Sequence, residues 1–301
     1  MSVTKWIPES LKAPIRGSSL FRAVYHPRHA ARLARTTKRL DQCAAQLAHT
    51  LHLAGDVRLE GARCLELGAG WVLTHALVCH LLGAKRVVAV DVERAARFDA
   101  LRAAVADAPP ALVRDLLAPF SDHGRVRARL ERLRSIERFD AAALAELGIV
   151  YRAPVDLARD ALSEPFDLIY SLSVLEHVPV DDVGALLANL ARQLTAGGTM
   201  LHVIHLEDHR DIARDPFAFL SARAQPFSRV EQTERGNRLR ASSWLDAFAA
   251  VPGLHARVLW AWQRWDAALP ATVEPSVRAH DETDLRTSHL GIAARREAPP
   301  S

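Results

Sequence analysis

The stretch CLELGAG, residues 64–70, decides the fold of this chain. An apolar run typical of a buried strand leads into a Gly-x-Gly turn, and the helical pattern THALVCHLLG follows at residues 74–83. Glycine at Gly68 and Gly70 lets a ligand approach the backbone without meeting a side chain. Taken alone the turn is a weak signal, because tight turns without a ligand also use glycine.

A second strand strengthens the interpretation. Residues 86–92, RVVAVDV, form a continuous β-branched run that ends at Asp91, about twenty residues after the glycines. In a doubly wound sheet this carboxylate lies beside the first loop, where it can accept both hydroxyls of a ribose. Leu73 occupies the position where a dinucleotide fingerprint needs a small residue, and Trp71 crowds the loop. The glycine turn and Asp91 together therefore predict an adenosine-type ligand, and Leu73 and Trp71 make a ligand without a pyrophosphate the better fit.

Strand and helix patterns alternate through much of the chain, which predicts an α/β doubly wound, mostly parallel sheet. An amphipathic helix precedes this region. We expect residues 1–50 and 206–250 to close over the ligand pocket and exclude water. The predicted layout is a cap at residues 1–58 and an α/β domain at 59–301, with insertions at about 94–148 and 206–250.

Composition excludes several classes of protein. The 301 residues carry 39 basic and 35 acidic side chains and are 49% hydrophobic, which rules out collagen-like, disulfide-framework and acidic disordered chains.

Cys43, Cys64 and Cys79 are predicted to be buried free thiols. No apolar run is long enough to span a bilayer, so we expect a cytoplasmic protein without membrane contact. The basic stretch at residues 125–134 is predicted to be the solvated face of a packed helix, so nucleic acid is not an expected partner.

Four motifs in order resemble those of the class I S-adenosylmethionine-dependent methyltransferases, over about residues 60–205. LELGAG is similar to the first motif of that family, VVAVDV to the second and FDLIYSLSVLEHV (166–178) to the fourth. LTAGGTMLHVIH (194–205) is similar to the turn and strand that follow. NRLRASSWL (237–245) and the tryptophan in LELGAGW resemble a bacterial subgroup with diverse small-molecule substrates.

The resemblance implies a seven-stranded Rossmann-like sheet with an S-adenosylmethionine cofactor. It implies that Gly68 and Gly70 lie near the methionine part, Asp91 on the ribose diol and Asp156 near the adenine. Asp160 is an alternative to Asp156, and either carboxylate can instead be a helix N-cap. The predicted cofactor-binding set is Glu66, Gly68, Gly70, Asp91, Val92, Asp156 and Ser171.

The predicted catalytic residues are Tyr170, His205 and His209. The ring of Tyr170 would stabilise a sulfonium by a cation–π contact, unless it is simply a packed strand tyrosine. His205 and His209 are candidates for a general base that removes a proton from the acceptor. His177, in a Glu-His pair, is predicted to hydrogen-bond backbone instead.

Other polar and aromatic residues have weaker interpretations. His205, Asp208 and His209 have a spacing that suits a metal, but no further ligand cluster supports one, and no metal is expected. Trp260 and Trp262 are expected to share one strand face and to belong to the core or a homodimer surface rather than to a ligand site. The candidates for substrate recognition are Asn237, Arg238, Arg240, Ser242 and Trp244.

The predicted function is methyl transfer to a small-molecule acceptor, by in-line displacement at the sulfonium methyl. One alternative keeps the cofactor: its own amine is the nucleophile, the aminobutyrate part cyclises to an azetidine and methylthioadenosine leaves. Another alternative is a cofactor-binding subunit without catalytic activity. The sequence leaves the acceptor open.

Overall fold

The computed structural model describes residues 19–222 and 227–297, and side chains from residue 27 onward. Residues 1–18 of the predicted cap lie outside the described residues. The rest of that cap forms two helices, α2 (Ser19–Arg35) and α3 (Leu40–Ala54). Within the described ranges, no helix combines the length and the apolar character needed to cross a membrane.

Seven strands form one sheet in the order β3-β2-β1-β4-β5-β7-β6. All neighbouring pairs are parallel except those of β7, which runs antiparallel to both β5 and β6. The predicted seven-stranded, mostly parallel Rossmann-like sheet is therefore confirmed. The strands are β1 (Arg63–Leu67), β2 (Arg86–Val90), β3 (Ile149–Arg152), β4 (Phe166–Leu172), β5 (Leu194–His205), β6 (Leu254–Gln263) and β7 (Thr287–Arg296).

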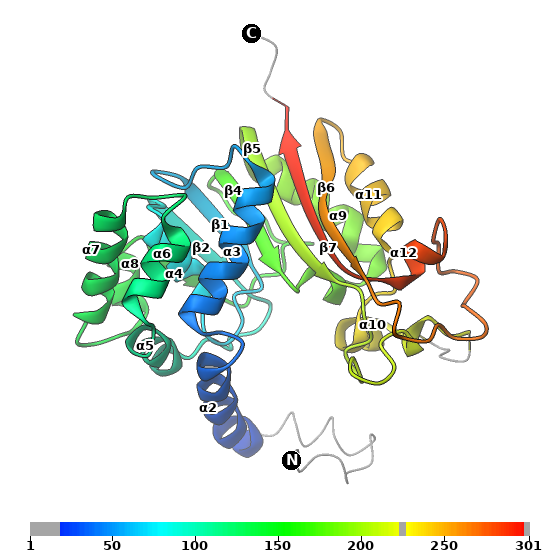
Figure 1. Ribbon diagram of the computed structural model, residues 1–301, viewed down its shortest axis with the longest axis horizontal. Helices are drawn as coiled ribbons and strands as arrows, with labels where there is room; N and C mark the ends of the chain where they lie inside the picture. The colour runs from blue at the N-terminus through cyan, green and yellow to red at the C-terminus, as the bar shows by residue number, and fades with distance from the viewer. Residues whose placement is uncertain (1–18, 223–226, 298–301) are drawn as a thin grey trace.

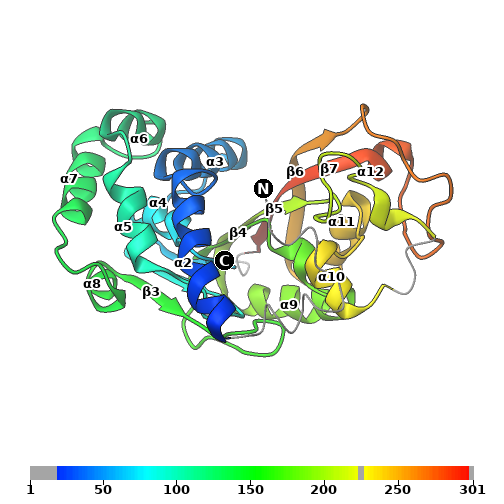
Figure 2. The same ribbon diagram turned by 90° about the horizontal axis from the view of Figure 1, so that it is seen from below.

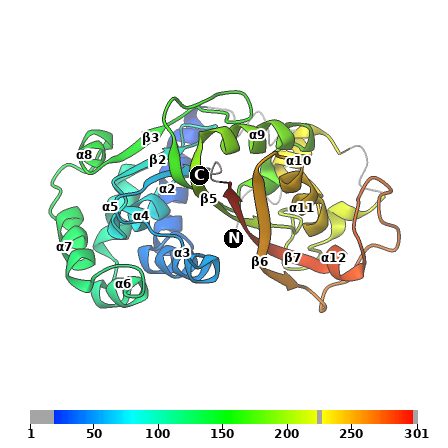
Figure 3. The same ribbon diagram turned by 90° about the horizontal axis from the view of Figure 1, so that it is seen from above.

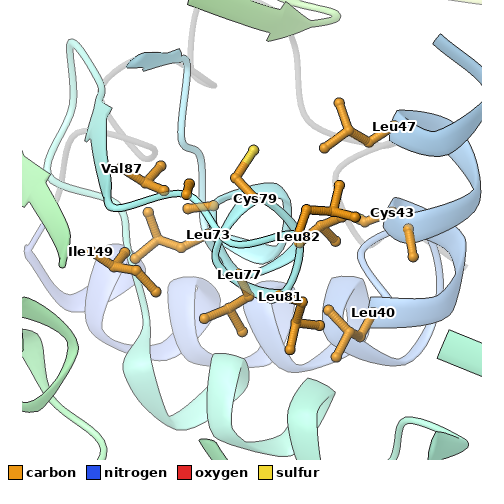
Figure 4. Close-up of a cluster of buried hydrophobic side chains, with 14 of the residues drawn as sticks. Leu40, Cys43, Leu47, Leu73, Leu77, Cys79, Leu81, Leu82, Val87 and Ile149 are labelled. Carbon is orange, nitrogen blue, oxygen red and sulfur yellow. The ribbon is translucent and has the colours of Figure 1, made fainter. Parts of the chain in front are cut away.

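One face of the sheet packs against a large hydrophobic core that includes α3 and α4 (Thr74–Leu81). Every residue of α4 is buried, in keeping with its mostly apolar sequence. Figure 4 shows Leu77, Cys79 and Leu81 of α4 among side chains of α3 and the strands. Cys43, Cys64 and Cys79 are buried and free, as predicted. The helices α5 (Phe98–Ala106), α6 (Pro110–Leu117), α7 (His123–Arg134) and α8 (Ala141–Glu146) extend this layer.

The opposite face packs against α9 (Val180–Gln193) and α11 (Ala241–Ala249). Figures 2 and 3 show these two helices on the other side of the sheet from α3 and α4. Trp244 and Phe248 of α11 are fully buried. Although α11 falls within the insertion predicted at 206–250, it covers the sheet and completes its core.

The carboxyl ends of the parallel strands gather at one edge of the sheet. In Figure 1 the antiparallel β7 points upward, so the strands that run parallel to one another end at the lower edge. Two short elements lie at this edge, the turn η2 (Leu175–His177) after β4 and the helix α10 (Arg229–Arg235). The strand order reverses between β1 and β4, and ligands of open α/β sheets bind at such a switch point.

Candidate functional site

A cavity of about 460 Å³ lies at the switch point, within the size range of small-molecule sites. Its wall is formed by the ends of β1 and β2, the loop after β3 and the segment after β4. Of the predicted cofactor-binding residues, five line it: Gly68, Gly70, Asp91, Val92 and Asp156. The wall also contains Arg159, Ser173, Val174, His177, Arg229 and Thr233, none of which was in the predicted set.

The two glycines of the turn have different surroundings. Gly68 has a φ of +68°, and an added Cβ would overlap the side chain of Val174, so the close packing of the loop after β4 requires glycine here. Gly70 has a φ of +62°, but an added Cβ would meet only the Gly68 carbonyl oxygen, 3.9 Å away. The backbone at Gly70 is therefore open to the cavity, where a ligand can approach it.

Asp91 is held in place at the cavity wall by two backbone amides. Its Oδ2 accepts a hydrogen bond from Gly70 N–H (2.8 Å) and its Oδ1 one from Glu93 N–H (3.0 Å). Each carboxylate oxygen has a second lone pair for a ligand hydroxyl. The strand β2 thus fixes a carboxylate directly against the glycine turn, the geometry that binding of a ribose diol requires.

Asp156 lines the same cavity and also makes local bonds. Its Oδ1 accepts from Ala158 N–H (3.0 Å), its backbone N–H donates to Asp160 Oδ2 (2.8 Å), and its carboxylate pairs with Arg159. Asp160 is not part of the wall. Asp156 and Asp160 therefore both accept local backbone hydrogen bonds, as in the capping role that the sequence analysis considered as an alternative. Of the two, Asp156 is the one that borders the cavity.

Glu66, Tyr170 and Ser171 lie outside the cavity wall. Glu66 and Tyr170 are neighbours across the β1–β4 pair and are buried on the α4 face of the sheet. Burial raises the pKa of Glu66 to about 8 and raises the pKa of Tyr170 well above its usual value. Ser171 points to the other face, where its hydroxyl bonds His202 Nδ1 (2.8 Å). These three side chains are core residues.

A second cavity, of about 380 Å³, lies between α3 and the strands β4 to β7. Trp260 and Trp262 line it with ring centroids 4.6 Å apart, so they share one face as predicted. Lys38 and His289 are among the polar residues of its wall. Ser173, the first residue after β4, lines both cavities and has a left-handed φ of 56°. The two cavities are therefore neighbours across this residue.

His205 and His209 lie close together, with ring centroids 4.8 Å apart. His205 Nε2 contacts Glu207 Oε2 (2.5 Å), and His209 Nε2 lies 3.9 Å from Glu176 Oε1. Burial lowers the pKa of His209 to about 3 and raises the pKa of Glu176 to about 8. His177 Nδ1 lies 2.6 Å from the Thr233 carbonyl, the backbone contact that the sequence predicts.

The segment 237–245, predicted to recognise substrate, contributes Asn237 and Arg238 to a further cavity of about 540 Å³, and most of its candidates also make structural contacts. Arg240 is fully buried and donates to the carbonyls of Leu206 (2.9 Å) and Leu285 (3.0 Å), and to that of Thr287. Asn237 bonds the carbonyls of Leu175 and Val178, which fixes the turn η2. The other candidates are also engaged: Ser242 bonds Asp284, Trp244 is in the core, and Arg238 stacks on Phe227.

Comparison with known proteins finds a family model and similar solved structures. A family model described as a methyltransferase domain matches residues 38–251. A solved S-adenosylmethionine-dependent methyltransferase from Mesorhizobium loti is 20% identical, with 85% of this chain and 98% of that chain covered and a TM-score of 0.44. The N-methyltransferase NodS from Bradyrhizobium japonicum is 14% identical, with 92% and 99% covered and a TM-score of 0.39. No curated protein matches the sequence.

The family model spans most of the chain, including both glycines, Asp91 and the whole first cavity. The cofactor of such enzymes, S-adenosylmethionine, suits a cavity with an open glycine turn and a fixed carboxylate. The chain therefore belongs to the class I S-adenosylmethionine-dependent methyltransferase family.

Proposed function

We propose that this chain transfers the methyl group of S-adenosylmethionine to a small-molecule acceptor that has a flat, apolar body. The observation that carries the proposal is that Ser173 lines both cavities. A cofactor in the first cavity and an acceptor in the second would meet at this residue. The enzyme then contributes mainly orientation, which lowers the entropic cost of bringing the two reactants together.

The first cavity supplies the contacts that a nucleoside cofactor needs. In this proposal Asp91 accepts the ribose hydroxyls, Gly70 offers open backbone, and Val92 and Asp156 border the adenine. When bound, the cofactor supplies a methyl group on a positively charged sulfur that is open to displacement. Tyr170 is buried away from both cavities, so no contact with the sulfonium is assigned to it.

The second cavity suggests the class of acceptor. Trp260, Trp262 and the imidazole of His289 present ring faces and edges, which suit a flat apolar molecule. His205 stacks on His289 with ring centroids 4.2 Å apart, so it lies just behind this wall. The imidazoles proposed from the sequence as a general base, those of His205 and His209, line neither cavity, so no contact with the acceptor is assigned to them.

Mass spectrometry of the nucleoside products tests the proposal. Purified protein is incubated with S-adenosylmethionine, once alone and once with a small-metabolite extract. We expect S-adenosylhomocysteine only with the extract. Methylthioadenosine formed without an acceptor would overturn the proposal in favour of internal cyclisation. Bound cofactor without turnover in any extract fraction would favour a subunit without catalytic activity.

Two tryptophan variants test the position of the acceptor. We expect Trp262→Ala to raise the KM for the acceptor and leave the Kd of S-adenosylmethionine unchanged. Trp265→Ala is the matched control, because Trp265 is equally exposed but packs on Arg286 and lines neither cavity. Equal effects of the two variants would contradict an acceptor in the second cavity.

A further inference from the structure

Four imidazole rings form a row between the two cavities. His177 and His209 have ring centroids 4.6 Å apart, His209 and His205 4.8 Å, and His205 and His289 4.2 Å. His177 lines the first cavity and His289 the second. Strand register explains part of the row, because the antiparallel pairing of β5 and β7 places His205 directly opposite His289.

Two buried groups in this row lack partners. Both carboxylate oxygens of Glu176 are buried without a hydrogen-bond partner among the residues that the structure describes, and the same holds for His209 Nε2. The Glu176 side chain is only 1% exposed. The 3.9 Å between Glu176 Oε1 and His209 Nε2 is too long for a hydrogen bond. A buried carboxylate without a partner is costly unless something else satisfies it, and a cation does so.

We propose that Glu176, His205 and His209 bind a divalent transition-metal ion. One ligand atom from each residue lies within 4.8 Å of the other two. With metal–ligand bonds of about 2.1 Å, the donor atoms of a tetrahedral site are about 3.4 Å apart, so each pair need close by little more than 1 Å. Two imidazoles and one carboxylate are typical ligands of zinc and non-haem iron(II).

The residues around the ligands have the roles that an outer shell of a metal site requires. Glu207 accepts from His205 through one oxygen (2.5 Å) and from Arg264 through the other (2.8 Å). A carboxylate in this position orients a ligating imidazole. Glu207 could also join His205 and His289 as a second set of ligands. We favour Glu176, because Glu207 is already neutralised by Arg264, whereas no described residue places a counter-charge within hydrogen-bond distance of Glu176.

Backbone bonds fix the three segments that carry the ligands. Asn237 N–H donates to the Glu176 carbonyl (2.8 Å), and His209 N–H donates to the Arg235 carbonyl (3.1 Å). Arg235 in turn pairs with Asp208, both of them buried. Asp208, the metal ligand considered from the sequence, is therefore engaged elsewhere. The His205 and His209 side chains are 14% and 20% exposed, so further metal positions are open to water or ligand.

Zinc binding by the full-length protein tests the site without cofactor or acceptor. The protein is stripped with a chelator, dialysed against micromolar Zn²⁺ and analysed for bound metal. We expect about one Zn²⁺ per chain, and a loss of affinity of at least about tenfold in His209→Ala and Glu176→Gln. His255→Ala is the control, because His255 also contacts a carboxylate, Glu297, but lies on the surface without a third ligand.

A stability measurement guards against variants that simply misfold. We expect Zn²⁺ to raise the melting temperature of the wild type and of His255→Ala, but not that of Glu176→Gln. Without metal, Glu176→Gln should melt at or above the wild-type temperature, because it removes a buried carboxyl without partners. The proposal is overturned if the stripped wild type takes up no Zn²⁺, or if His209→Ala and Glu176→Gln bind it as tightly as wild type.

Discussion

Replacement of Asp91 by alanine should weaken cofactor binding far more than it weakens the fold. The carboxylate is fixed by Gly70 N–H and Glu93 N–H and faces the first cavity. Hydrogen bonds from hydroxyls to a charged group contribute about 1.5–3 kcal/mol each. Loss of one bond should raise the Kd of S-adenosylmethionine by about 10- to 150-fold, and loss of both by up to about 20,000-fold. The two amides lie at a partly exposed wall where water can replace the carboxylate, so stability should fall by only about 1 kcal/mol.

Isothermal titration calorimetry with S-adenosylmethionine measures this change, and urea unfolding measures stability. Asp91→Asn keeps one acceptor oxygen and should give an intermediate Kd. Asp115→Ala is the control, because Asp115 is exposed, pairs with Arg114 and lies outside both cavities. An unchanged Kd in Asp91→Ala would refute our placement of the cofactor.

Four further substitutions test other parts of the account. Gly68→Ala, whose Cβ overlaps Val174, should cost about 2–3 kcal/mol of unfolding free energy, whereas Gly70→Ala should cost about 1 kcal/mol and mainly weaken cofactor binding; equal effects in urea unfolding and calorimetry would contradict this. Because the pKa of Glu66 is raised to about 8, its proton stabilises the fold fully below about pH 4, and this stability is lost as pH rises through 8. The unfolding free energy of Glu66→Gln should therefore rise relative to that of wild type by up to about 5 kcal/mol across that interval, and parallel stability curves would show the reasoning to be wrong. Arg240→Lys should lower the free energy of unfolding by about 2–4 kcal/mol, because it leaves buried carbonyls without donors. A small shift of the urea midpoint would disprove this prediction.

The sequence predicted the sheet and the first cavity well, because both depend on local patterns. Fewer than thirty residues carry these patterns, namely the glycines at 68 and 70 and the β-branched run that ends at Asp91. Together they predict a strand, a turn and the edge of the sheet at which the ligand binds. The order of the remaining motifs then implied the positions of β4 and β5. Asp91 against Gly70 N–H is the contact that this reasoning anticipates.

The faces of the strands were harder to predict. Glu66, Tyr170 and Ser171 belong to strands that lead to the site, but alternation along a strand turns each side chain to one face of the sheet and away from its end. Ser173 reaches the site because it follows the last residue of β4. Position relative to the strand end, more than residue type, decides which of these side chains borders the cavities.

The histidine row could not be predicted from the sequence, because its members come from distant segments. His205 and His289 are 84 positions apart and meet only through the β5–β7 register. Glu176 comes from the turn after β4 and is fixed by Asn237 from a third segment. The Glu-His pair at 176–177 was noticed for its histidine, whereas the glutamate is the residue that the fold buries without a partner.

A crystal structure of the protein with S-adenosylhomocysteine tests the central claim most directly. Our account predicts density for the nucleoside in the cavity of about 460 Å³, with the ribose on Asp91 and the ligand over Gly70. Density in the second cavity, or anywhere else on the chain with the first cavity empty, would contradict it.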